Sequence, residues 1–155
     1  MTRHANTTTS NLAITYQCLR RLEEALRLRR DVYSGWLKLN GEEYLSTLIA
    51  ANNYAQSLVD LQSFKEVKSL LRRILPVARR VLRESHELTL KMRQNYVMAL
   101  YRDKCATLDD LREAVTTIED TARIARRVFG GAHPTTTGIE AVLREAQAAL
   151  RSRTE

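Results

Sequence analysis

Residues that break helices are scarce in this chain of 155 residues, which has five glycines and two prolines. The β-branched residues form no alternating runs, so little β-sheet is expected. The two cysteines, Cys18 and Cys105, show neither CxxC pairing nor a metal-ligand spacing, and a reducing, cytoplasmic compartment is the simplest expectation. No apolar run reaches the roughly 18 residues of a membrane helix, and no apolar signal segment follows Met1. The abundance of Ala, Leu, Arg and Glu instead predicts an all-α fold.

Motifs that carry catalysis are also missing. The sequence has no glycine-rich phosphate loop, no nucleophile elbow and no paired-carboxylate motif. His86 and His133 lack the partners that a metal site requires. We therefore expect no enzyme activity, no cofactor and no metal.

The net charge is +7, carried mostly by arginine, and two arginine pairs stand out. Arg79-Arg80 and Arg126-Arg127 fall at the same position of an internal repeat described below. Such residues can complement the dipole in the last turns of a helix, or they can form a phosphate-binding stripe. We favour the first interpretation, because the pairs stand among Glu and Asp and no aromatic platform accompanies them.

An internal repeat organises the sequence. Asn11, Asn53 and Asn95 each precede two packing residues and lie 42 residues apart. A second marker follows at Leu22, Phe64 and Leu111, and a third at Tyr44, His86 and His133. The last interval of the second marker is 47 residues, which places five extra residues in the stretch 103–107. Three markers in one register indicate a repeat protein.

Apolar residues within each repeat recur at helical spacing. From each second marker, apolar positions follow at steps of three, four and seven, and Leu48, Ala51, Ala55, Leu58 and Leu61 form another stripe. Each unit therefore reads as two antiparallel helices that bury their stripes by stacking. We expect a single domain over 1–155, with units at about 7–43, 44–85 and 86–132 and a capping helix at 133–153. The seven expected helices span about 7–19, 22–39, 44–61, 64–82, 87–103, 108–128 and 134–152.

Three residues mark expected features of these helices. Thr107 can cap the helix that follows it, with Asp109 and Asp110 in the first turn. Pro134 stands where a first-turn proline is tolerated. Pro76 falls inside a helix, removes the bond to the carbonyl of Arg72 and predicts a kink.

The markers resemble those of the tetratricopeptide repeat family. An Asn-Leu-Ala turn at Asn11, an apolar or aromatic residue four positions past its Leu, and a Glu-Ala pair are similar to that family's pattern. The 42-residue period and the Gly-x-x-His-Pro-x-Thr sequence at 130–136 resemble the repeats of kinesin light chains. The resemblance covers nearly the whole chain, although the first two units lack the His-Pro pair. It implies a right-handed α-solenoid of antiparallel helix pairs.

The resemblance also implies a concave groove for extended peptides, lined by the first helix of each unit. The positions that match groove residues are Ser10, Asn11, Asn52, Asn53, Gln56, Lys91, Gln94, Asn95 and Arg102. Asparagine amides both donate and accept, so they can bond a peptide backbone, and the cations favour an acidic peptide. The asparagines can equally satisfy neighbouring helix backbone.

Three functions follow as hypotheses. The first is a protein-interaction scaffold or adaptor that binds an extended, acidic peptide segment of a protein partner. The alternative is a basic helical module that binds nucleic acid through Arg79, Arg80, Arg126 and Arg127. The third is a homo-oligomer formed by end-to-end stacking, because about three and a half units leave an end helix partly uncovered. No membrane role is expected.

Overall fold

The computed structural model describes residues 2–155, and the side chains of residues 12, 14, 15 and 18–155. Every regular element in this part of the chain is an α-helix. The helices are α1 (Thr2–Asn40), α2 (Leu45–Asp60), α3 (Phe64–Leu82), α4 (Glu87–Arg102), α5 (Leu108–Phe129) and α6 (Pro134–Thr154). The all-α solenoid expected from the sequence is confirmed.

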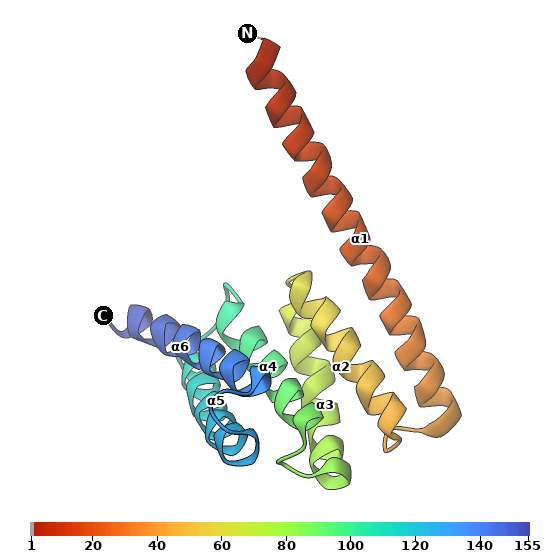
Figure 1. Cartoon of the computed structure of the whole chain (residues 1–155), viewed down its shortest axis with the longest axis vertical. Coiled ribbons are helices and arrows are strands. Elements are labelled where there is room, and N and C mark those ends of the chain that lie inside the picture. The colour runs from red at the N-terminus through yellow and green to blue at the C-terminus, as the bar shows by residue number, and fades with distance from the viewer. Residues whose placement is uncertain (1) are drawn as a thin grey trace.

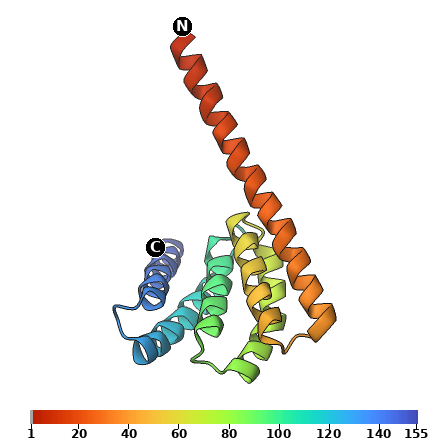
Figure 2. The same ribbon diagram turned by 45° about the vertical axis from the view of Figure 1, so that its right-hand side comes forward.

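The helices form two layers. Helices α2, α4 and α6 make up the A layer, in which α2 contacts α4 and α4 contacts α6. Helices α1, α3 and α5 make up the B layer, and each contacts the A-layer helix that follows it. Figures 1 and 2 show the stack, and in both views the N-terminal half of α1 projects away from the other five helices. Consecutive helices are antiparallel neighbours, as helix pairs with short connections require.

The predicted apolar stripes form the core of the second and third repeats. In the B layer, Val67, Ile74 and Ala78 are fully buried against the A layer. In the A layer, Leu48, Ala51 and Ala55 are also fully buried and form part of the same core cluster. The stripe of the first repeat is different, because Val32 is 52% exposed and Trp36 is 36% exposed.

The predicted helix starts are confirmed at three places. Thr107 and Asp110 form a capping box at the start of α5, each side chain bonding the other residue's backbone N–H. Pro134 occupies the first turn of α6. The repeat-entry histidines are N-caps, since Nδ1 of His86 accepts from the N–H of Leu88 and that of His133 accepts in the same way. This role accounts for both histidines without a metal.

The expected break between a helix at 7–19 and another at 22–39 is wrong. Helix α1 runs without interruption from Thr2 to Asn40, so the described residues 2–155 form six helices rather than seven. In the second repeat the corresponding turn places Gln62 at a φ of 58° and is followed by Ser63 as the N-cap of α3. The first repeat has Arg20 and Arg21 at these positions, and arginine favours the helix interior. Pro76 lies inside α3, and the kink stays a prediction.

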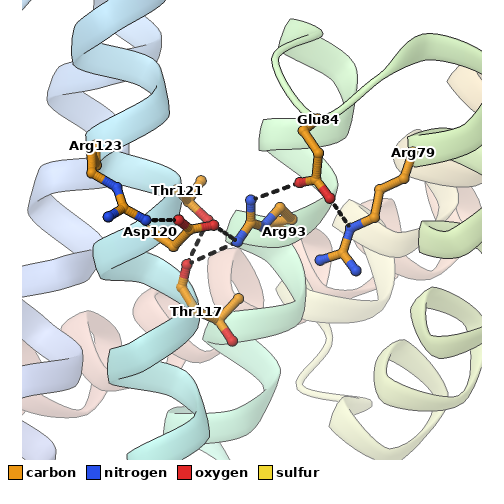
Figure 3. A network of polar contacts seen from close by, with 7 residues as sticks. All are labelled: Arg79, Glu84, Arg93, Thr117, Asp120, Thr121 and Arg123. Atoms are coloured by element: carbon orange, nitrogen blue, oxygen red, sulfur yellow. Dashed lines mark hydrogen bonds and ion pairs between the residues drawn. The ribbon is translucent and has the colours of Figure 1, made fainter.

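A buried arginine joins two layers of the third repeat (Figure 3). The Arg93 side chain of α4 is 4% exposed and bonds Asp120 of α5 at 2.6 Å and Glu84 at 3.2 Å. One Nη also donates to the backbone carbonyl of Thr117, whereas Nε has no partner. The side chains of Asp120 and Glu84 are 37% and 54% exposed, so the Arg93 guanidinium is the most deeply buried of the three charged groups. The network fixes how α4 lies on α5 and on the turn before it.

Residues at the end of each B-layer helix share an unusual backbone conformation. Gly41, Arg83 and Gly130 occupy equivalent repeat positions, with φ of 80°, 77° and 84°. Arg83 also has ψ of 163°, a region that is essentially restricted to glycine.

We expect Arg83→Gly to raise the free energy of unfolding by about 1 kcal/mol, because it relieves this strain. Urea denaturation of both proteins checks this, with Gly130→Ala as the matched variant that should be destabilised; an unchanged midpoint for both would contradict it.

The Arg93 network predicts an unequal response to removal of its two carboxylates. We expect Asp120→Ala to lower the free energy of unfolding by about 2 kcal/mol, because it strands a buried guanidinium. Glu84→Ala removes the more exposed partner and should cost less than about 1 kcal/mol. Urea denaturation of the two variants measures the difference. Equal losses would show that the network does not depend on the buried contact.

Candidate functional site

The sequence-predicted asparagines meet in the A layer. Nδ2 of Asn95 on α4 donates to Oδ1 of Asn52 on α2 at 3.1 Å. Asn95 is only 3% exposed, so its side chain lies between the two helices. Asn53 occupies the same repeat position as Asn95 but is exposed, and its backbone carbonyl accepts from Arg29 at 3.3 Å. Asn53 is therefore open to a ligand, whereas Asn95 already bonds a neighbouring helix.

A second group of predicted residues lies where α4 and α6 begin. Glu87, Lys91 and Gln94 of α4 face His133 and Gly138 across a cavity of about 390 Å³. Lys91 is paired with Glu87 at 3.2 Å. The hydroxyl of Thr135 donates to the same carboxylate at 2.6 Å. These bonds, from Thr135 first and then from Lys91, hold the pKa of Glu87 below its ordinary value.

Arg102 lies at the other end of α4, beside a larger cavity of about 790 Å³. Its guanidinium carbon is 5.6 Å from the centre of the Tyr101 ring, and its Nη2 bonds Glu145 of α6 at 3.3 Å. The Tyr101 hydroxyl donates to that same carboxylate. Burial, and then this hydrogen bond, raises the pKa of Tyr101 to about 12, and the hydrogen bond lowers the pKa of Glu145. The tyrosine is thus a neutral donor that holds Glu145 beside Arg102.

The walls of this larger cavity combine apolar groups with two cations and one carboxylate, that of Asp60. They come from both layers and from the turns after α2 and α4, namely Leu22, Val59, Asp60, Gln62, Phe64, Tyr101, Arg102 and Lys104. Of these residues, the sequence had predicted only Arg102 as a groove residue, and Leu22 and Phe64 only as repeat markers. Lys104 belongs to the five-residue insertion, which was the one signal in the sequence for a feature at this edge.

The remaining groove candidates are placed separately. Gln56 donates to Asp60 on its own helix at 3.0 Å. Ser10 and Asn11 lie outside the described side chains.

The arginine pairs of the alternative hypothesis are largely engaged with carboxylates. Arg79 pairs with Glu84 at 3.2 Å. Arg80 pairs with Glu43, and Arg126 pairs with Glu140. Arg127 is exposed near the end of α5. Three of the four cations therefore have a carboxylate close by, which weakens the attraction for phosphate groups.

Neither a metal cluster nor a membrane span emerges from the described part of the chain. No group of three or more His, Cys, Asp or Glu side chains in it could hold a metal ion. No helix there has both the length and the apolar character needed to cross a bilayer.

The two-layered stack of antiparallel helix pairs defines an α-helical repeat protein. A family model described as Tetratricopeptide repeat matches residues 4–80, about half of the chain. The chain belongs to the tetratricopeptide repeat family. Among curated proteins, none matches the chain significantly. Members of this family are typically non-catalytic scaffolds, which indicates protein partners for this chain.

Five carboxyl groups predict how stability responds to acid. The pKa values of Glu87, Asp103, Asp110, Asp120 and Glu145 all lie below the ordinary values. A carboxyl with a lowered folded pKa adds stability that is fully present above the unfolded pKa, near 4, and is lost as the pH falls through the folded pKa. We therefore expect the urea midpoint to stay level from about pH 7 to 5 and to fall below about pH 4. Asp120→Asn should make that decline shallower; an equally steep decline in the variant would contradict the role of this group.

Proposed function

We propose that this protein is an interaction module that binds an extended, acidic peptide segment of a protein partner. The observation that carries the proposal is the 790 Å³ cavity between the ends of α2 and α4. Its apolar wall of Leu22, Val59 and Phe64 offers an anchor site for one apolar side chain of a peptide. Lys104 and Arg102 stand beside it, although Arg102 also pairs with Glu145 and Asp60 lies in the same wall. Carboxylates that flank the anchor would therefore meet Lys104 and would compete with Glu145 for Arg102.

The exposed amide of Asn53 supports backbone recognition along α2. Asn53 lies on α2, the helix that also supplies Val59 and Asp60 to the cavity wall. An amide that both donates and accepts can bond an extended backbone without selecting its side chains. Affinity would then come from backbone bonds, and selectivity from the cavity and its cations.

The proposal predicts which peptides bind and which charges matter. The probe is a display library of random 12-residue peptides, selected on the purified protein at physiological salt. Recovered peptides should be enriched in Asp and Glu around one apolar residue. Arg102→Gln/Lys104→Gln should weaken a selected peptide about tenfold in fluorescence polarisation, because two partly exposed charge contacts are lost. Asn53→Ala should weaken it further.

The matched control removes the same charge elsewhere. Arg112→Gln/Arg127→Gln lowers the net charge equally on α5, away from the cavity, and should change the affinity less than twofold. If both double variants lost the same affinity for the peptide, binding would depend on net charge and not on the cavity. Selected peptides without enrichment in Asp and Glu would also overturn the proposal. Recovery of nucleic acid that dissociates with added salt would instead support the basic-module hypothesis.

A further inference from the structure

Apolar residues on both halves of α1 are exposed, although their counterparts in the third repeat are buried. On the C-terminal half, Val32 is 52% and Trp36 is 36% exposed, whereas Ile74 and Ala78, 42 residues later, are fully buried. On the N-terminal half, Leu12 is 56% and Ile14 is 55% exposed. Their counterparts 84 residues later are Tyr96 and Met98, each 7% exposed.

The later repeats show what covers such faces. In the third repeat, α4 packs against α5, and the hydroxyl of Tyr96 donates to Glu113 across that interface at 2.7 Å. The counterparts of this pair in the first repeat are Leu12 and Glu24. By its position in the repeat, the segment at residues 7–19 corresponds to the helix that packs against the segment at residues 22–39. On one straight helix the two faces cannot reach each other.

The sequence at the junction keeps α1 straight. The second repeat turns through Gln62 at positive φ and Ser63, whereas the first repeat has Arg20 and Arg21, which favour continued helix. Folding back would also need a helix start without a capping residue at position 21.

We propose that a second copy of this chain covers the exposed face of α1 by exchange of the N-terminal segment. Residues 7–19 of each copy lie antiparallel along residues 22–39 of the other, in the place that α2 takes on α3. Two-fold symmetry then covers both faces on both copies and closes the assembly. The covered stripe continues an interface already present, because Tyr33 of α1 is 5% exposed and stacks on Tyr54 of α2.

The exchange would also extend the A layer. Asn95 is buried because it bonds Asn52 on the preceding A-layer helix. One repeat earlier the equivalent positions are 53 on α2 and 10 in the exchanged segment, so this segment would lie beside α2 at the exposed Asn53. This inference rests on the packing of α1 and is independent of the proposed function. In the exchanged dimer the segment would cover Leu22 and Asn53, so only the monomer would offer them to a peptide.

Cross-linking distinguishes the assemblies in the full chain. In a Cys18→Ser/Cys105→Ser background, the single variants Leu12→Cys and Glu24→Cys are mixed, unfolded and refolded together, and treated with a short bismaleimide. Exchange predicts covalent dimers from the mixture and almost none from either variant alone. Light scattering of the wild-type chain should give the mass of a dimer.

A hinge variant supplies a second measurement. Arg20→Gly/Arg21→Ser introduces a residue that accepts positive φ and a helix cap, so it should weaken the dimer at least tenfold and give a monomer. Arg20→Ala/Arg21→Ala removes the same charges but keeps the helix and should remain dimeric. A monomeric wild-type chain would overturn the proposal. A cross-link within one chain of the Leu12→Cys/Glu24→Cys double variant would show that residues 7–19 fold back onto residues 22–39 of the same chain, which would also overturn the proposal.

Discussion

A helix with one apolar stripe is stable in water only if another helix covers that stripe, and this need organises the whole chain. The A-layer helix α4 contacts four other helices and buries Leu90, Met92, Val97 and Leu100. Helix α3 contacts two, and it too buries its stripe. Among the described residues, helix α1 contacts only α2, and it exposes Leu28, Val32 and Leu39. Burial thus follows the number of helical neighbours, as expected for a stack held by nearest-neighbour contacts.

Polar groups within this apolar stack determine which helices meet and in what register. Arg93 replaces the apolar Ala51 of the preceding repeat and reaches Asp120 on α5. Asn95 reaches Asn52 on α2, so buried polar side chains of α4 bond a neighbour in each layer. Each group is buried and costs free energy if the register slips and its partner is lost. These polar contacts favour one alignment of α4 with its neighbouring helices, whereas apolar contacts alone would permit several.

Much of this fold could be predicted from the sequence, because the repeat markers coincide with packing positions and caps. The range expected for α3 agrees at both ends, and those for α2 and α4 to α6 differ by at most two residues. The break predicted within α1 was wrong, because equivalent repeat positions predict which residues pack but not where the helix turns. The turn depends on local residues, here Arg20 and Arg21. The site was harder to predict: Asn53 and Asn95 hold one repeat position, yet their exposure differs with the neighbouring helix. That difference depends on tertiary context.

Part of the positive charge at the larger cavity comes from a departure from the repeat pattern. The five-residue insertion after α4 contributes Lys104, for which the shorter turn after α2 has no counterpart. The insertion is held in place, since Asp103 accepts from the N–H of Cys105 at 2.9 Å and pairs with Lys68 at 3.0 Å. Lys104 is therefore presented from a fixed turn, which limits the entropy lost when an anionic ligand binds. A stack of similar repeats supplies the scaffold, and this departure from the repeat supplies the charge on which selective binding would depend.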